Sequence, residues 1–450
     1  MSTQTHRSFA SVVVDVVCLV LVFLLAYGAM MYAPHVKGEL ALIGAVGFLL
    51  LSGTLTSKIL DIVRIPHLTG YLLAGLVAGP HVLHVIDHET VTRLQPVNTL
   101  ALALIALAGG AEINLEDIKR GFKGLAISML VQSVSVVVIV SAVFVLAARS
   151  LISFTAGFSI SAIIGIALLW GVVAVSRSPS ATLAILSQTR ARGPITSYTL
   201  GFVMSSDVVV VILLAAVTAI ARPLLDPSAT VSFAAFKTLG HEILGSVALG
   251  TTLGLVLSVY LRLVGKQLLV VLVALGFGAT ETLRYLNFEP LLTFLVAGFI
   301  VRNLSRQGEK FLHAIEGTGA VVYVVFFASA GAHLDLPLLK QLWVVALLLA
   351  GSRALVTWVA ARVSSRLAND PPVLRTWAWA PLISQAGLTL GLSAMIARDF
   401  PAFGAGFRAL AIATVAINEM VGPILFKLAL DRNGESRAEA TLAEIAEAEG

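Results

Sequence analysis

The sequence predicts an all-α polytopic membrane protein of about fourteen transmembrane helices, built as two inverted six-helix repeats with two broken crossover helices. Three observations predict this fold: an apolar composition, similar motifs in the two halves, and two proline-interrupted segments at matching places. Of the 450 residues, 58% are hydrophobic and 12% are charged, and the mean hydropathy is +0.95. Soluble domains carry about 25% charged residues, so a water-soluble fold of this length could not cover its apolar surface.

Apolar runs long enough to cross a bilayer recur from one end of the chain to the other. Charged residues and Pro/Gly clusters separate fourteen of them, at residues 11–32, 40–60, 68–86, 97–112, 124–148, 158–188, 196–221, 233–262, 267–286, 289–304, 318–335, 341–363, 374–397 and 405–430. The first run could pass for a signal peptide. Its length, and the lack of a clear small-x-small cleavage site, favour a retained helix. The single cysteine, Cys18, excludes disulfides and thiol metal sites within the chain.

The placement of Lys and Arg predicts the orientation of these helices. Nineteen basic residues fall on one side of the fourteen-span arrangement and nine on the other, while Arg177 and Arg353 fall inside apolar segments. Together with the even number of spans, this bias predicts that both termini are cytoplasmic.

Two pairs of motifs predict an internal repeat. Residues 108–119 (AGGAEINLEDIK) align with 329–340 (SAGAHLDLPLLK) at an offset of 221, and 71–79 (YLLAGLVAG) align loosely with 291–299 (LLTFLVAGF). The second to seventh segments then correspond to the ninth to fourteenth. The interval of seven is odd, so the repeats are inverted, as in alternating-access transporters. Generic similarity among apolar helices is the other interpretation.

This repeat divides the chain into five parts. They are an extra N-terminal helix (1–36), the first inverted repeat (37–222), a connector helix (223–266), the second inverted repeat (267–430) and a short cytoplasmic tail (431–450).

The sixth and thirteenth segments are predicted to be broken helices. They contain VSRSPSAT (175–182) and APLISQAGLT (380–389), which combine Pro with hydroxyl, amide or glycine residues. Proline removes a backbone donor, and nearby hydroxyls can satisfy the groups that local unwinding frees. A plain proline kink is the alternative for each segment alone. Two interrupted segments at matching places indicate a binding site near the membrane midplane.

Charged residues deep in apolar segments are the candidate functional groups, because each costs at least about 2.5 kcal/mol near the bilayer centre. Asp207 lies in the seventh span beside a run of valines, Arg353 in the middle of the twelfth, and Glu419 in the middle of the fourteenth, 212 residues after Asp207. Arg177 lies beside the first break, where it could reach the cytoplasmic mouth or neutralise Glu419. A purely structural ion pair between Asp207 and Arg353 is the alternative.

A buried carboxylate next to unwound backbone and hydroxyl groups offers the oxygen ligands that a hard cation such as Na⁺ or Li⁺ prefers. The same carboxylate can instead take up a proton. Competition between cation and proton at Asp207 would give exchange. Arg353 could hold Asp207 while no cation is bound, and an arginine is not expected to carry the transported proton because it stays charged.

At these residues the chain resembles the monovalent cation:proton antiporter superfamily, the sodium/proton exchangers and their bacterial relatives. The motifs that carry the resemblance are GYLLAGLVAGP (70–80), ALAGGAEINLEDIKR (106–120), SPSATLAIL (178–186), GFVMSSD (201–207), FFASAGAHLDL (326–336) and SQAGLTLGLS (384–393). The resemblance implies that Asp207 is the essential carboxylate, that Ser206 stands where relatives have Asn or Asp, and that Arg353 is the basic residue of the site.

We therefore expect two groups of site residues. The cation-binding group is Asp207, Ser206, Ser178, Ser180, Thr182, Ser384 and Gln385. The charge-balancing group is Arg353, Glu419 and Arg177. With one carboxylate in the Ser206-Asp207 pair, the resemblance implies electroneutral one-for-one exchange of Na⁺, Li⁺ or K⁺ for H⁺.

The resemblance also implies a homodimer in the bacterial inner membrane with a role in pH homeostasis, surrounded by lipids and without nucleic acid. No resident cofactor is expected beyond the transported ions. The sequence shows no nucleophile motif, metal-ligand cluster or phosphate loop, so we do not expect an enzyme. Two alternatives stay open: a transporter of the same fold for an organic or anionic solute, with Arg177 and Arg353 as anion partners, and a non-transporting membrane scaffold or sensor.

Overall fold

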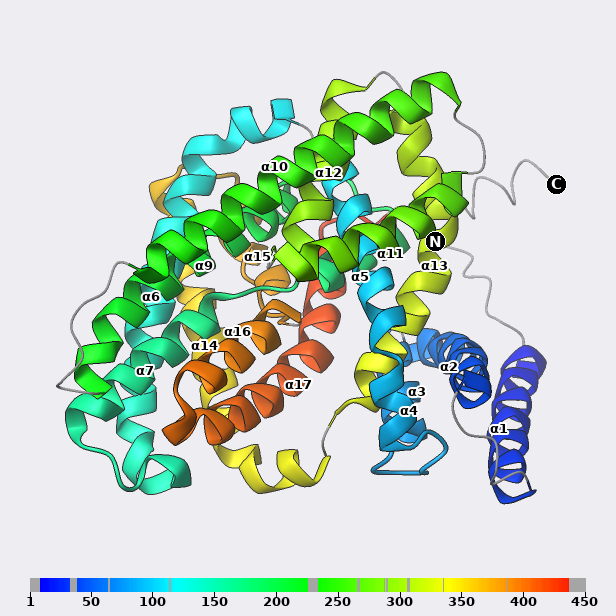
Figure 1. Cartoon of the computed structure of the whole chain (residues 1–450), viewed down its shortest axis with the longest axis horizontal. Helices are drawn as coiled ribbons and strands as arrows, with labels where there is room; N and C mark the ends of the chain where they lie inside the picture. Colours follow the sequence, from blue (N-terminus) through cyan, green and yellow to red (C-terminus); the bar gives the residue numbers. More distant parts are fainter. Residues whose placement is uncertain are drawn as a thin grey trace. The chain divides into compact units, whose positions relative to one another are not determined.

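The computed structural model describes residues 9–32, 39–63, 65–112, 115–225, 234–264, 268–286, 288, 290–305, 308–334, 336–385 and 387–436. Across these ranges the chain is almost wholly helical and contains no β-strand (Figure 1).

The helices of the first half run from α1 to α9. Their bounds are α1 (Phe9–Tyr32), α2 (Glu39–Leu60), η1 (Asp61–Val63), α3 (His67–Ala78), α4 (His88–Arg93), α5 (Gln95–Glu112), α6 (Leu115–Leu151), η2 (Ser153–Thr155), α7 (Ile160–Val175), α8 (Pro179–Thr189) and α9 (Pro194–Leu225). Those of the second half are α10 (Ala234–Leu263), α11 (Leu268–Leu286), α12 (Pro290–Leu304), α13 (Gly308–Ala332), α14 (Leu336–Leu367), α15 (Pro372–Trp377), η3 (Ala380–Leu382), α16 (Gly387–Asp399) and α17 (Pro401–Arg432).

Each of the fourteen predicted segments coincides with one helix or with a broken helix, which confirms the predicted fold class. Three boundaries differ from the helix ends by eight residues or more. The fifth and eleventh segments were predicted to begin at residues 124 and 318, whereas α6 begins at Leu115 and α13 at Gly308. The third segment was predicted to reach residue 86, but α3 ends at Ala78. Gly79 is extended (φ −66°, ψ 176°) because it precedes Pro80, whose ring disfavours helical geometry in the residue before it.

Seven helical stretches of the described chain are long and apolar enough to cross a membrane: α2, α6, the α7–α8 segment, α9, α10, α14 and α17. Five shorter apolar helices, in α1, α3, α5, α12 and α13, accompany them. Large apolar side chains such as Leu25, Leu146 and Leu244 are more than two-thirds exposed. Such a surface suits a lipid solvent, and the chain is a multi-pass membrane protein.

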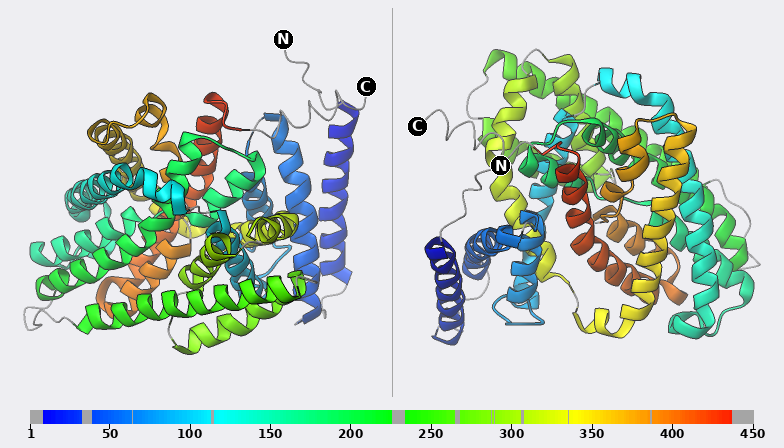
Figure 2. Two further views of the ribbon diagram at one scale, coloured as in Figure 1. Left: turned by 90° about the horizontal axis from the view of Figure 1, so that it is seen from above. Right: turned by 180° about the vertical axis from the view of Figure 1, so that it is seen from behind.

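The helices form two compact units. Unit 1 comprises Met1–Ile105 and Gly317–Leu336, and unit 2 comprises Ala106–Glu316 and Pro337–Gly450. In unit 1, α1 packs along α2 (blue in Figure 2). Phe48 and Leu49 of α2 lie in the apolar core of this unit. The five-part division predicted above follows the repeat and stays a prediction.

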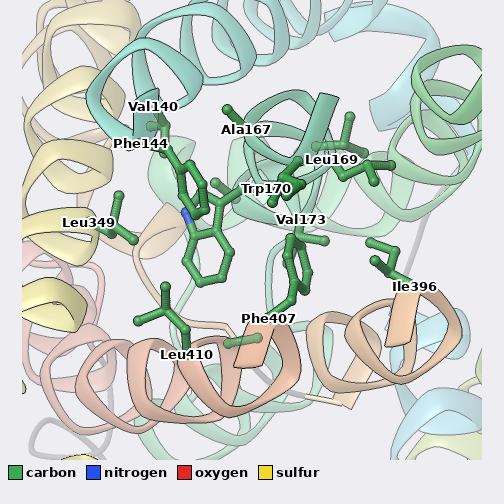
Figure 3. Packing of buried hydrophobic residues seen from close by; sticks show 14 of the residues in the cluster. Val140, Phe144, Ala167, Leu169, Trp170, Val173, Leu349, Ile396, Phe407 and Leu410 are labelled. Atoms are coloured by element: carbon green, nitrogen blue, oxygen red, sulfur yellow. The ribbon is translucent and has the colours of Figure 1, made fainter. Parts of the chain in front are cut away.

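The core of unit 2 is built around Trp170 of α7. Its ring lies 5.7 Å from that of Phe144 in α6 and 5.2 Å from that of Phe407 in α17, measured between centroids (Figure 3). Helices α14 and α16 add Leu349 and Ile396 to the same cluster. This core fixes α7, the first half of the first broken segment, against the second half of the chain.

The order of elements repeats. Two series of six elements lie on either side of α10 and correspond in order. The first is α2, α3, α5, α6, α7–α8 and α9, and the second is α11, α12, α13, α14, α15–α16 and α17. Two crossings with the same chemistry support this equivalence. In unit 1, α3 and α13 approach so closely that a Cβ at Gly75 would overlap the Ala328 carbonyl, and one at Gly331 the Leu72 carbonyl.

The equivalent crossing in unit 2 joins α5 and α12. There a Cβ at Gly110 would overlap the Leu295 carbonyl, and one at Gly298 the Leu107 carbonyl. Small residues at such crossings let membrane helices pack backbone to backbone. The α5 and α13 residues are related by the predicted offset of 221. The α3 and α12 residues are related by an offset of 223 instead. The loose alignment of 71–79 with 291–299 has an offset of 220, so it has to be shifted by three residues, and YLLAG (71–75) then matches FLVAG (294–298).

The start of α9 lies at the end of α17, where the Arg192 N–H donates to the Glu435 carbonyl at 3.0 Å.

Candidate functional site

The first break interrupts the α7–α8 segment at residues 176–178. Ser176 follows the last residue of α7 and has extended backbone angles (φ −59°, ψ 150°). Pro179 opens α8, where its missing N–H costs no helical hydrogen bond. The Ser178 hydroxyl caps α8 by accepting a hydrogen bond from the Ala181 N–H at 3.1 Å. The predicted interruption is therefore present, and serine side chains stabilise it.

The second break lies between η3 and α16, at residues 383–385 of the described chain. Ser384 and Gln385 in this break are buried. Helix α17 approaches it closely at Gly422, where a Cβ would collide with the Ser384 hydroxyl. Both broken segments predicted from the sequence are thus confirmed, and both lie in unit 2.

Arg353 of α14 joins the two breaks. Its side chain is 1% exposed and donates four hydrogen bonds, all to backbone carbonyls. Two reach the end of α7, from Nε to Ala174 (2.7 Å) and from NH2 to Ser176 (3.0 Å). Two reach the other break, from NH1 to Ile383 (2.7 Å) and from NH2 to Leu382 (3.1 Å). A broken helix leaves carbonyls without N–H partners, and Arg353 satisfies them at both breaks.

Arg177 lies within the first break and is completely buried. Its NH1 donates to the carbonyls of Ala174 and Ser176, both at 3.2 Å. Its Nε and NH2 make no hydrogen bond within the part of the chain that the structure describes. The positive charges of Arg177 and Arg353 repel each other. A buried guanidinium group is costly unless it is hydrogen-bonded and balanced by negative charge nearby.

A second set of hydrogen bonds links the breaks to α17. Gln385 donates through Nε2 to the Val173 carbonyl (3.2 Å) and to the Ser176 hydroxyl (3.3 Å). Its Oε1 accepts from Nδ2 of Asn418 at 2.7 Å. The Ser176 hydroxyl also lies 2.5 Å from that of Thr389 in α16. Side chains from α16, α17 and both breaks thus form one buried polar network.

The predicted hydroxyl ligands differ in how they are engaged. The hydroxyls of Ser178 and Ser180 lie 3.3 Å apart at the start of α8. Thr182 is buried, and its Oγ1 makes no hydrogen bond to any residue the structure describes. The Ser206 hydroxyl donates to the Val203 carbonyl of its own helix at 2.7 Å. Thr182 therefore offers an oxygen that no described group uses.

Asp207 and Glu419 lie on the equivalent helices α9 and α17 and are 8% and 6% exposed. Helix α9 packs against α7 and α8, and α17 packs against α8, α16 and η3. Both carboxylate-bearing helices therefore border the broken segments. Unit 2 buries the two arginines together with three carboxylates, because Glu435 is buried as well.

All ten residues predicted for the site lie in unit 2. Contacts join Arg177 and Arg353 through shared carbonyls, Ser178 to Ser180, and Gln385 to the first break. The roles given to these ten residues stay predictions. Three members of the polar network, Ser176, Thr389 and Asn418, were not predicted as site residues. Asn418 carries a usable signal, an amide in the middle of an apolar helix. The hydroxyls of Ser176 and Thr389 carry no sequence signal that distinguishes them from neighbouring Ser and Thr residues.

Comparisons with known proteins find relatives of this arrangement. A family model described as sodium/hydrogen exchanger, transmembrane, matches residues 46–430. The structure of the sodium proton antiporter MjNhaP1 from Methanocaldococcus jannaschii at pH 8 has a TM-score of 0.62 at 15% identity, covering 87% of this chain and 95% of that chain. An electron-microscopy structure of the same antiporter has a TM-score of 0.67 at 17% identity, with coverage of 89% and 99%. These two likenesses show the fold. No curated protein sequence matches the chain.

Proposed function

The chain belongs to the sodium/hydrogen exchanger family, and we propose that it is a secondary transporter that exchanges a monovalent cation, Na⁺, Li⁺ or K⁺, for protons by alternating access. The observation that carries this proposal is the pair of helix breaks joined by Arg353 in the unit that also buries Asp207. Broken helices at matching places in two repeats are where transporters of this architecture bind their substrates.

Asp207 is the proposed carrier. A buried carboxylate can be neutralised by a proton or by a cation, and each excludes the other. The carbonyls of Ala174, Ser176, Leu382 and Ile383 already accept from Arg353. The oxygen ligands available to a cation are therefore the carboxylate and the hydroxyls of the breaks. Thr182 is the best supported of these, because it is buried and its Oγ1 makes no hydrogen bond to any residue the structure describes.

A single carrier carboxylate supports one-for-one exchange. With Asp207 and Glu419 ionised and Arg177 and Arg353 protonated, these four groups sum to zero, and the third buried carboxylate, that of Glu435, binds the start of α9. Binding of either one proton or one monovalent cation raises this sum to +1. The two loaded forms then carry the same charge, so exchange would be electroneutral. In this scheme Arg353, Arg177 and Glu419 balance charge and are not themselves carried.

We also propose that the protein works as a homodimer in a bacterial inner membrane, with both termini cytoplasmic. The positive-inside bias of the sequence supports the orientation. Protection of the C-terminus from protease in inside-out vesicles would contradict it. A monomer in lipid nanodiscs that keeps its full exchange rate after reconstitution would argue against the dimer.

Flux in vesicles tests the function. Purified protein is reconstituted with a pH indicator inside, a proton gradient is imposed, and Na⁺, Li⁺ or K⁺ is added in turn. An antiporter dissipates the gradient when its cation is added, and protein-free vesicles serve as the control. If none of the three cations accelerates dissipation, cation:proton exchange is not the function.

One observation favours a second candidate, transport of an anionic solute. Arg177 is completely buried, with two donor nitrogens that no described group accepts from. An anion would satisfy both. In the same vesicles, counterflow of radiolabelled carboxylates without any response to Na⁺, Li⁺ or K⁺ would support this candidate over the first.

A further inference from the structure

We propose that Glu435, just after α17, is a positioning residue for transport: it ties the start of α9, which carries Asp207, to the end of α17, which carries Glu419. This inference rests on the proposed function, because it takes Asp207 as the carrier. Glu435 belongs to a short segment that follows the last helix and lies within the predicted cytoplasmic tail (431–450).

Glu435 accepts four hydrogen bonds, all from residues at or just before the start of α9. Its side chain is 4% exposed, and Oε1 accepts from the Ile195 N–H at 2.7 Å. Oε2 accepts from the N–H and the hydroxyl of Thr196, at 2.9 and 2.8 Å. The Arg192 N–H donates to its backbone carbonyl at 3.0 Å. Hydrogen bonds to an ionised acceptor are about twice as strong as neutral ones.

Helix α9 has no cap of its own. Its N-cap residue is Gly193, whose carbonyl accepts the first helical hydrogen bond, from the Ser197 N–H at 3.0 Å. Glycine has no side chain that could accept from Ile195 or Thr196, as a Ser or Asp in this place would. A Cβ at Gly193 would collide with the Glu435 carboxyl group. The cap is thus supplied by a residue 240 positions later, and its negative charge suits the positive end of the helix dipole.

The geometry makes this contact more than a local cap. Asp207 lies twelve residues into α9 from Ile195, about 18 Å along the axis at 1.5 Å per residue. Glu419 lies thirteen residues before the end of α17 at Arg432, about 20 Å along that helix. Helix α17 also packs against α8, which carries Ser180 and Thr182. A tie between the shared ends therefore fixes the axial position of Asp207 relative to the hydroxyls expected to bind the cation.

The test separates two effects of Glu435: capping the start of α9, and linking that start to the end of α17. Glu435→Ala removes the three hydrogen bonds of the carboxylate, which serve both purposes. The double variant Gly193→Asp/Glu435→Ala restores a cap within α9 and leaves only the backbone hydrogen bond from Arg192 to residue 435 between the two ends. The introduced aspartate side chain would occupy the space that the Glu435 carboxyl group vacates. Exposed Glu89→Ala, in α4, is a matched control for loss of a glutamate.

We expect Glu435→Ala to lower the melting temperature by a few degrees and to raise the apparent KM for the cation several-fold. The double variant should regain the melting temperature but keep the raised KM. If the double variant regains both, or if Glu435→Ala leaves KM unchanged, the contact is only a helix cap and the proposal is wrong.

A distance measurement keeps this test independent of transport. In a Cys18→Ser background, spin labels at Ile212→Cys in α9 and Val421→Cys in α17 occupy exposed positions. The distance distribution should be broader in the double variant than with Glu435 intact. Absence of cation-driven exchange in the wild type would refute the proposed function alone, whereas unchanged distance distributions would refute the tie.

Discussion

At the scale of single residues, Asp207 is the group on which the proposed exchange depends. It is buried on a helix that borders both α7 and α8. Asp207→Asn keeps the shape of the side chain but can neither ionise nor release a proton, so exchange should fall to the level of protein-free vesicles. Folding should survive or improve, because a buried charge is removed. Flux and melting temperature measured on the same preparation check both parts.

A matched control for this change is Asp15→Asn, which alters an acidic residue of α1 outside the repeat. It should exchange cations at the wild-type rate. If folded Asp207→Asn protein also does so, the carrier is another group, and Glu419 is the first to examine.

Arg353 gives a second prediction at this scale. Arg353→Ala leaves the carbonyls of Leu382 and Ile383 without their described donor, whereas those of Ala174 and Ser176 keep Arg177. A buried carbonyl left unsatisfied costs about 1–3 kcal/mol, so the loss should be about 2–6 kcal/mol. Thermal unfolding in detergent measures it. Arg366→Ala, an exposed arginine of the same helix, should change stability little.

Arg353 also marks a limit of the sequence analysis. An arginine in an apolar segment predicts a buried partner, and the obvious partner in the sequence was the carboxylate of Asp207. The side chain instead donates to four backbone carbonyls. Backbone carbonyls look the same at every position of a sequence. Which of them lose their helical partners depends on where two distant breaks meet.

At the scale of elements, the crossings of α3 with α13 and of α5 with α12 depend on glycine. Gly75→Ala would place a methyl group on the Ala328 carbonyl and force the helices apart, at a cost of about 1–3 kcal/mol. Gly351→Ala in α14 meets no atom within 4 Å and should stabilise its helix by about 0.5–1 kcal/mol. Melting temperatures that move in the same direction in the two variants would contradict this packing.

Elements were predicted well because their signals are local. Runs of apolar residues predict helices, and Pro179 with its flanking serines predicts the first break. The start of α9 is the contrary case. Nothing near Gly193 indicates a cap, because the cap is Glu435, and the tail of the chain has no periodic pattern from which its burial could be predicted.

At the scale of the whole molecule, the proposed one-for-one stoichiometry predicts how transport responds to voltage. The two loaded forms of the site carry equal charge in the scheme above, so exchange moves no net charge across the membrane. Imposing a potential with a potassium gradient and valinomycin, with Na⁺ or Li⁺ as the exchanged cation, should leave the rate unchanged. A rate that rises or falls with the potential, after correction for proton leak, would mean that the stoichiometry is not one to one.

The Glu435 contact also gives the protein a place where an outside force can act. A protein that binds the chain beyond Ser436 and pulls on it would act directly on the contact that anchors the Asp207 helix. Such a force would then change the affinity for the ion, without a ligand entering the membrane.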